Sequence, residues 1–265
     1  MKFLGRSSLF SLVTSTPAIV FLAAALVPCL ALAEVSKTEE YNFELKEGGR
    51  ISLSNVNGDV SIEGTDGRQV HIVATKKADS QKYLDGMNIE IDAKEDSIRI
   101  ETKHPSNGML NWGGDDSGSV DYKLTVPHDV ELDSIDTVNS DVEISGVIGS
   151  IDTESVNGKL HVTGVSGNLS ADTVNGNIDV EFLQLGSGQR VSADAVNGRI
   201  VLRLPESSSA QIGAETLNGS IDADDFGLES DGGFVGHELD GQIGSGEARV
   251  SIDTVNGSID IKKVK

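Results

Sequence analysis

The stretch Ser251–Ile261, which reads Ser-Ile-Asp-Thr-Val-Asn-Gly-Ser-Ile-Asp-Ile, recurs with small changes through most of the chain. Apolar residues lie at or near four positions before each Asn and three and five positions after it, alternating with polar residues. This is the pattern of two short strands joined by a turn, in which Gly, and Asn less readily, supplies positive φ. The turn residues defined in this way are Asn57, Gly58, Asn139, Asn157, Gly158, Asn175, Gly176, Asn197, Gly198, Asn218, Gly219, Asn256 and Gly257.

The copies of this unit have a nearly constant spacing. From Asn139 onward, successive Asn residues are 18, 18, 22, 21 and 38 residues apart, and the last gap is close to two periods. A period near 20 residues indicates a stack of units, because one pair of short strands cannot bury its own apolar side. We predict an all-β fold, a β-solenoid of short strands with coils of about 18–22 residues, right-handed as parallel crossovers usually are. An antiparallel meander or a sandwich of Asn-Gly hairpins is the structural alternative.

The first 33 residues have the features of a secretory signal peptide. Lys2 and Arg6 form a positive start, 18–32 is apolar, and Ala31-Leu32-Ala33 resembles a cleavage site. We therefore expect an exported protein, periplasmic or at the cell surface, whose mature chain has no transmembrane span. The expected organisation is a signal peptide at 1–33, N-terminal β-strands with the first repeat copy at 34–130 and solenoid repeats at 131–265, with 34–265 forming one continuous domain.

The composition restricts the partners. The 265 residues contain 21 Lys and Arg against 42 Asp and Glu, a net charge of −21, and the only cysteine lies in the signal segment. Such an acidic surface repels nucleic acid and anionic lipid, and it favours basic partners or divalent cations. An exported chain of this size without disulfides must rely on an aliphatic core.

The region before residue 130 is expected to cap one end of the stack, because open sheet edges invite aggregation. Residues 87–93 and 97–102 flank a charged turn and predict a β-hairpin. The Gly-rich stretch 104–119 predicts a long loop, and its Trp112 is a candidate contact for a partner. Folding of Trp112 over the end of a sheet is the plainer interpretation. At the other end, Lys262, Lys263 and Lys265 are expected to protect the open edge of the last coil.

The repeated Thr-Val-Asn-Gly-x-Ile-x-Ile blocks resemble a bacterial family of "putative adhesins", the toast-rack-like β-strand-repeat proteins of the domain-of-unknown-function type. The closing Leu239-Asp-Gly-Gln-Ile-Gly-Ser-Gly and the strand Tyr122-Lys-Leu-Thr-Val-Pro127 are similar to that family as well. The likeness covers residues 39–265. It implies a β-solenoid-like domain of the cell envelope, linked loosely to adhesion and without an established chemistry.

An acidic residue stands three positions before most of the Asn residues. In a stack these side chains would form a row about 5 Å apart, which we treat as weak candidates for a Ca²⁺ site, the only cofactor considered. A solvated acidic face that keeps the array soluble is the plainer interpretation. If the row forms, repulsion should raise the pKa of its carboxyl groups. The residues are Asp136, Glu154, Asp172, Asp194, Glu215 and Asp253.

No catalytic residues are predicted. The five histidines are scattered, and the sequence has no nucleophile elbow, phosphate-binding loop or zinc motif. We therefore predict a non-catalytic envelope protein with a structural or adhesion role, whose partner is an unidentified envelope protein or glycan. The alternatives are a cation-dependent or glycan-binding module and, less favoured, a polysaccharide-active enzyme. The oligomeric state is not predicted.

Overall fold

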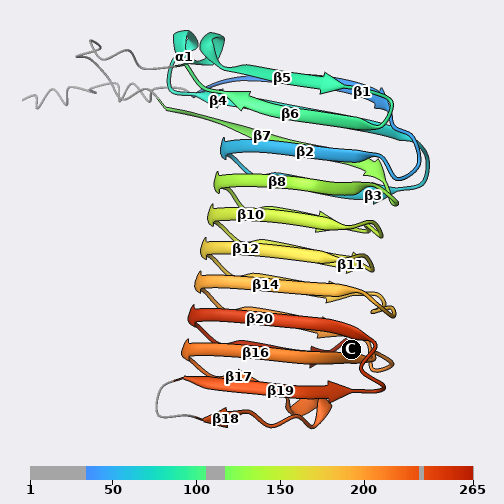
Figure 1. Cartoon of the computed structure of the whole chain (residues 1–265). Coiled ribbons are helices and arrows are strands. Elements are labelled where there is room, and N and C mark those ends of the chain that lie inside the picture. Colours follow the sequence, from blue (N-terminus) through green and yellow to red (C-terminus); the bar gives the residue numbers. More distant parts are fainter. Residues whose placement is uncertain (1–33, 106–116, 233–235, 265) are drawn as a thin grey trace, which may run out of the picture. The chain divides into compact units, whose positions relative to one another are not determined.

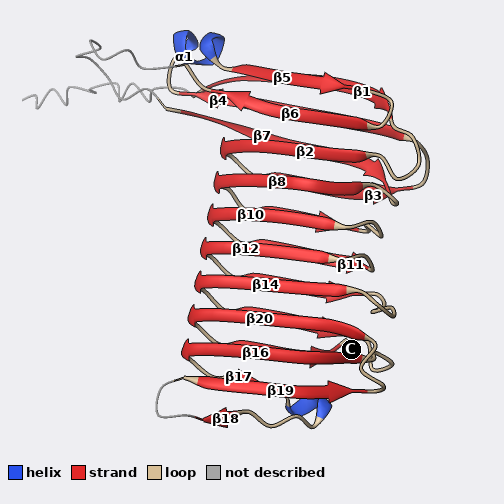
Figure 2. Cartoon of the chain, viewed as in Figure 1, coloured by secondary structure: helices blue, strands red, loops and turns tan. Residues whose placement is uncertain are grey.

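The computed structural model describes residues 34–105, 117–232 and 236–264. The chain divides into two units, Met1–Leu32 and Ala33–Lys265, and the described residues all belong to the second unit. Strands dominate this unit, and they form one sheet of ten strands and one of eleven, which we call sheet A and sheet B (Figures 1 and 2). The two sheets face each other and enclose a single aliphatic core.

Each coil contributes one strand to sheet B and the next strand to sheet A, with a corner between them that is Asn-Gly in every coil except that of β8 and β9, where it is Asn139-Ser140. Neighbouring coils are parallel and in register, so that Asn157 pairs with both Asn139 and Asn175. The coils, in spatial order, are β2 (Arg50–Asn57) with β3 (Val60–Thr65), β8 (Glu131–Asn139) with β9 (Val142–Ser145), β10 (Ile151–Asn157) with β11 (Leu160–Val165), β12 (Leu169–Asn175) with β13 (Ile178–Phe182), β14 (Arg190–Asn197) with β15 (Ile200–Leu204), β20 (Ala248–Asn256) with β21 (Ile259–Lys263), and β16 (Ala210–Asn218) with β17 (Ile221–Asp222).

The core confirms the predicted alternation. In a representative coil Ala171, Ile178 and Val180 are fully buried, and the corresponding residues of the other coils lie above and below them. Each coil adds only a few aliphatic side chains, which become buried because the next coil covers them. The solenoid prediction is therefore confirmed.

The Asn side chains form a continuous ladder along one edge of the stack. Asn175 Nδ2 donates to Asn157 Oδ1 at 3.0 Å, and Asn197 Nδ2 donates to Asn175 Oδ1 at 2.9 Å. Like bonds of 2.8–2.9 Å continue the ladder through Asn57, Asn139, Asn256 and Asn218. Because the same residue recurs at every corner, an Asn within the ladder can donate through Nδ2 to one neighbouring coil and accept through Oδ1 from the other.

The prediction that Asn adopts positive φ at these corners is wrong. Among the described residues only glycines have positive φ; at the corners these are Gly58 and Gly158, whereas Gly176, Gly198, Gly219 and Gly257 do not have it. Glycine is needed there because the coils approach closely: a Cβ on Gly198 would lie 1.7 Å from the carbonyl oxygen of Gly176. The corner is therefore a stacking contact, and a hairpin turn of the primed type is not formed.

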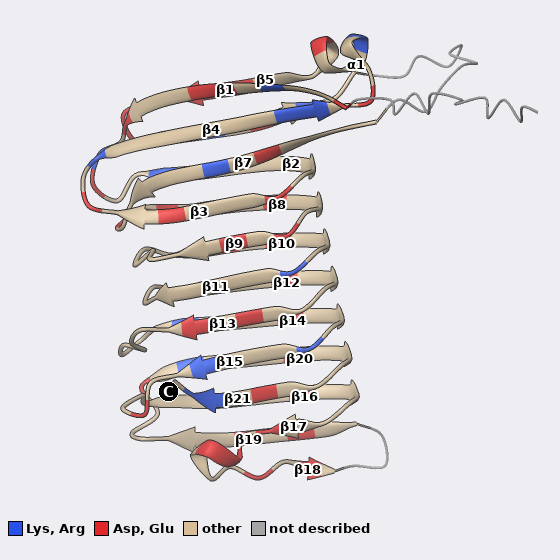
Figure 3. Cartoon of the chain, turned by 180° about the vertical axis from the view of Figure 1, so that it is seen from behind, with Lys and Arg blue, Asp and Glu red and all other residues tan. Residues whose placement is uncertain are grey.

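The coil has the predicted right-handed sense. In Figure 1 the coil strands of the near sheet, β8 to β14, run to the left. In Figure 3, which is turned by 180°, β9, β11 and β13 of the other sheet also run to the left, so in the view of Figure 1 they run to the right. The coils advance downward in both views from β8 to β14. A chain that runs to the left on the near side and to the right on the far side while it descends follows a right-handed path, as is usual for parallel crossovers.

The N-terminal end of the stack is covered by longer antiparallel strands. In sheet A, β4 (Gln69–Ala78) pairs with both β1 (Val35–Glu44) and β7 (Gly118–Pro127), and β7 continues the stack onto β3. In sheet B, β5 (Asn88–Ala93) and β6 (Ser97–Lys103) form the predicted hairpin, and β6 pairs with β2. The short helix α1 (Gln81–Gly86) links β4 to β5.

The order of the coils in space differs from their order in the chain. The last coil, β20 with β21, lies between β14 and β16 in sheet B and between β15 and β17 in sheet A. The far end is covered instead by β19 (His237–Ile243), antiparallel to β16, by β18 (Asp231–Gly232) and by the 3-10 turn Asp224–Phe226.

The prediction that the terminal lysines protect an open edge is therefore wrong for the two that are described. Lys262 and Lys263 lie on an inner strand, and they pair with Asp222 and Glu206 of neighbouring segments. Lys265 lies outside the described residues. Because the final coil is inserted between two others, its charges are used for contacts within the stack.

Candidate functional site

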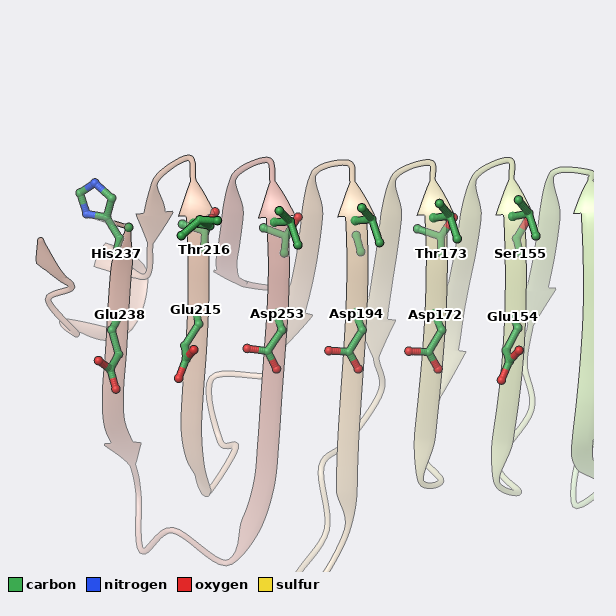
Figure 4. A pocket seen from close by; sticks show the side chains of 18 of the residues that line it. Glu154, Ser155, Asp172, Thr173, Asp194, Glu215, Thr216, His237, Glu238 and Asp253 are labelled. Carbon is green, nitrogen blue, oxygen red and sulfur yellow. The ribbon is translucent and has the colours of Figure 1, made fainter. Parts of the chain in front are cut away.

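The outer face of sheet B carries a continuous row of carboxylates. The residues three before each corner Asn are direct register partners from strand to strand, and Glu238 of β19 extends the row by one. Figure 4 shows most of these side chains side by side, pointing out from the sheet. We call this set the acidic row; in spatial order it is Asp136, Glu154, Asp172, Asp194, Asp253, Glu215 and Glu238.

A second row, of exposed aliphatic side chains, runs parallel to the acidic row. It is formed by the residue immediately before each corner Asn, and its members are between 36% and 50% exposed. The sequence analysis did not single out these residues, although an apolar residue at an outward alternate position in every copy was the available signal. We call this set the valine ladder: Val56, Val138, Val156, Val174, Val196, Val255 and Leu217.

The acidic row and five members of the valine ladder line one groove of about 860 Å³; the five are Val156, Val174, Val196, Val255 and Leu217. It extends from Asp136 to β19 and β18, which contribute His237, Glu238 and Asp231 to the lining. Figure 4 shows His237 at this end. None of the described residues that line it is Lys or Arg. The groove therefore offers an apolar wall and an anionic wall on the same face of one sheet.

The four aspartates of the acidic row accept hydrogen bonds from serine hydroxyls two residues earlier on the same strand. Ser170 Oγ donates to Asp172 at 3.2 Å, and Ser192 Oγ donates to Asp194 at 3.0 Å. Within the described part of the chain, no Lys or Arg forms an ion pair with a member of the acidic row. The row thus concentrates negative charge that only hydroxyl groups compensate.

The pKa values reflect this crowding. Burial, together with the neighbouring Asp194 carboxylate, raises the pKa of Asp172 to about 6. Burial also raises the pKa of Asp253, with a further contribution from Asp194 and Glu215. The expectation that these carboxyl groups titrate above their ordinary range thus holds for Asp172 and Asp253, with burial as the leading cause.

One end of the acidic row could hold a cation. Oxygen atoms of Asp152, Glu154 and Asp172 lie within 4.8 Å of one another, and hard cations such as Ca²⁺ take carboxylate oxygens. Burial, followed by the charges of Asp136 and Asp133, raises the pKa of Asp152. Clusters of exposed acids of this kind also occur without an ion.

The outer face of sheet A has a different charge pattern (Figure 3). Arg199 Nε lies 2.6 Å from Asp260 Oδ2, and Arg203 pairs with Asp179. Some acids on this face are thus paired with bases from neighbouring coils, whereas the described members of the acidic row on sheet B have no such pair.

Two further predictions concern a partner contact and a membrane span. Trp112 lies outside the described residues, so its role as a partner contact stays a prediction. Among the described residues no helix is long and apolar enough to cross a membrane.

Comparison with known proteins gives a family match. The family model described as Toastrack DUF4097 matches residues 46–262. No curated protein shows significant sequence similarity to the chain.

Several solved structures match the chain at low sequence identity. A "putative cell adhesion protein" from Clostridium sporogenes ATCC 15579 is 16% identical, with 86% of this chain and 100% of that chain covered and a TM-score of 0.48. A "putative lipid binding protein" from Parabacteroides distasonis ATCC 8503 is 14% identical, with 86% and 97% covered and a TM-score of 0.31. A "putative adhesin" from Bacteroides fragilis NCTC 9343 is 12% identical, with 85% and 97% covered and a TM-score of 0.28.

Proposed function

Because the chain belongs to the Toastrack DUF4097 family and carries a signal-like segment, we propose that it is a non-catalytic binding protein of the bacterial cell envelope. Its binding surface is the outer face of sheet B. The observation that carries the proposal is the groove in which the acidic row and the valine ladder lie side by side. Exposed apolar side chains that continue over seven coils are typical of an interaction site.

The regularity of the acids argues for binding over catalysis. General acid and base catalysis uses a pair of carboxyl groups whose surroundings push their pKa values apart. In the groove, each coil presents an acid at the same place on an open face, so no single pair is set apart. A surface repeated in this way is suited to an extended partner that contacts several coils.

The proposal is tested by co-sedimentation of the purified protein with bacterial envelope fractions. The triple variant D172N/D194N/D253N neutralises the centre of the acidic row and keeps the side-chain shapes. Its matched control, E63Q/E143Q/E181Q, removes three charges from the outer face of sheet A. We expect the first variant to lose at least four-fifths of the bound protein and the control to bind as the wild type does. Equal loss in both variants, or in neither, would refute sheet B as the binding surface.

A cation-dependent mode of binding is the second candidate. The observation that favours it is the cluster of Asp152, Glu154 and Asp172. Ca²⁺ bridging these acids to an anionic group of the envelope would make sedimentation sensitive to chelators. If EDTA abolishes envelope binding and Ca²⁺ restores it, this mode replaces direct binding; if EDTA has no effect, it is wrong.

A further inference from the structure

We propose that the groove on sheet B is the docking site for a basic amphipathic helix of a partner protein. The helix lies along the axis of the stack, with its apolar side on the valine ladder and its Lys and Arg side chains on the acidic row. This inference rests on the proposed function, because it names the kind of partner that the same surface receives.

Charge complementarity identifies the partner as basic. The seven carboxylates of the acidic row face a groove whose described lining contains no Lys or Arg. His237 is the only basic residue among the described lining residues. The side chains of Asp172 and Asp253 are partly buried, so water compensates their charge less well than on an open surface. A cationic side chain placed beside them would relieve the repulsion within the row and would bring the partner to this face.

The valine ladder requires that the partner is apolar as well. Its seven side chains lie on consecutive coils, two residues along each strand from the acidic row. Two residues of a strand span about 6.7 Å, which is less than the 10–12 Å diameter of a helix with its side chains. A single helix can therefore cover both rows at once, as in other complexes in which an amphipathic helix fills a groove.

The spacing of the coils favours a helix over an extended chain. Neighbouring strands lie about 4.8 Å apart, so the carboxylates recur at that interval along the stack. On a helix, side chains on the same face recur with each turn, about 5.4 Å, whereas on an extended strand they recur about every 6.7 Å. Over the length of the row, about 29 Å, one face of a helix therefore offers about six side-chain positions and an extended strand about five. The helix comes closer to one cation for each of the seven carboxylates, and flexible Lys and Arg side chains can absorb the remaining mismatch.

The length of the groove sets the length of the helix. Seven strands make six intervals, or about 29 Å, which corresponds to about 19 helical residues. A second copy of this chain is a poor occupant because its net charge is −21 and its own exposed rows are acidic. Nucleic acid is disfavoured for the same reason.

The test uses three labelled 20-residue peptides of equal length and measures fluorescence anisotropy with the purified full chain. The first peptide has Leu and Lys at helical spacing, so that it forms an amphipathic helix. The second has the same composition in strict alternation, which presents an amphipathic strand. The third has Glu in place of every Lys in the first. We expect the helical peptide to bind at least ten-fold more tightly than the other two, and its affinity to fall as salt is added.

Protein variants locate the site. D172N/D194N/D253N should weaken binding of the helical peptide at least ten-fold, and V174T/V196T/V255T, which keeps the branched shape, at least five-fold. The sheet A control E63Q/E143Q/E181Q should stay within two-fold of the wild type. Equal weakening by the control would show attraction by net charge alone and would overturn the proposal. Equal or tighter binding of the alternating peptide would overturn the helix.

The outcome can be separated from that of the proposed function. If no peptide binds but D172N/D194N/D253N still loses envelope binding, the helical partner is wrong and the binding surface stands. If neither peptide binding nor envelope binding depends on the acidic row, both are wrong. Circular dichroism of the mixture provides a second measurement, because docking should increase the helix signal of the peptide and variants that do not bind should not.

Discussion

The outer faces of the two sheets are built from the same repeat but carry charge in different ways. On sheet A, Arg199 and Arg203 reach the carboxylates of neighbouring coils, so charges of both signs are present and form ion pairs. On sheet B, the acids three before each Asn follow one another from strand to strand, and the aspartates among them accept hydrogen bonds from serine hydroxyls. Sheet B also exposes the valine ladder, one residue before each corner.

This difference arises because stacking near-identical copies in register repeats the side chain at each position from strand to strand. A pair of opposite charges that is repeated becomes a neutral lattice, and a single carboxylate that is repeated becomes a charged row. Opposite charges across neighbouring strands stabilise a sheet, and like charges directly opposite one another destabilise it. Sheet A is therefore expected to be the face that stabilises the coil and sheet B the face that is available for binding.

Removal of a base from sheet A should have the largest effect. In R199M, the Asp260 carboxylate loses its closest partner at 2.6 Å while its side chain is only 10% exposed. We expect a loss of about 1–2 kcal/mol in the free energy of unfolding, because a charged group with little access to water is left without its hydrogen-bond donor. Urea unfolding measures this. R190M, on an exposed side chain of sheet B, is the control and should change stability by less than about 0.5 kcal/mol.

Removal of acids from sheet B should have the opposite sign. D172N/D194N/D253N takes away like charges that lie opposite one another, and we expect a gain of about 1 kcal/mol in the free energy of unfolding. Thermal unfolding at pH 7.5 measures it as an increase in Tm. The control E63Q/E143Q/E181Q, on sheet A, should not raise Tm. A lower Tm in the sheet B variant would mean that the hydrogen bonds to the carboxylates outweigh the repulsion.

The pH dependence of the free energy of unfolding tests the role of the acids on sheet B. The pKa of Asp172 is raised to about 6 in the folded state, above its ordinary value of 3.8, so the folded state binds a proton more readily than the unfolded state. Stability should therefore increase as the pH falls from 7.5 through 6 toward 4.5. The pKa of Glu39 is lowered to about 2, despite its burial, by hydrogen bonds from Lys37, Tyr41 and Lys76.

Because the pKa of Glu39 is lowered, the stability that this group contributes is lost as the pH falls below about 4.5, and a maximum should lie near that value. Urea unfolding at four pH values measures the profile. D172N should flatten the part between pH 7.5 and 4.5 and leave the acid side unchanged. A wild-type protein that loses stability steadily from pH 7.5 downward would contradict the interpretation of sheet B.

The smallest effect is expected from Ca²⁺. If Ca²⁺ is bound by Asp152, Glu154 and Asp172 with a Kd near 1 mM, 1 mM CaCl₂ should stabilise the fold by about 0.4 kcal/mol. Differential scanning calorimetry should show a small increase in Tm that D152N removes. E131Q, at the start of β8, serves as the charge-matched control. An equal increase in both variants would indicate screening of the acidic face without a defined site.

Much of the fold could be predicted from the sequence because its rules are local. The alternation around Asn157 and Asn175 determines which side chains face inward, and the period near 20 determines that the units stack. The acidic row followed from the same reasoning, since residues at equal distance from the Asn must align once the coils are in register. The Asn ladder and the close contact at Gly198 could not be predicted, because both depend on the distance between neighbouring corners.

The alternation and the repeat period in the sequence are enough to specify the coil: its aliphatic core, its corner residues and the face on which each charge lies. Only the tertiary structure decided the order of the coils and the groove. Near-identical copies offer near-identical surfaces, so local pattern cannot say that β20 pairs with β14 and β16; the connections and the covering strand β19 select that place. The same holds for the groove, since the valine ladder is exposed because no further described segment covers it on the outer face of sheet B.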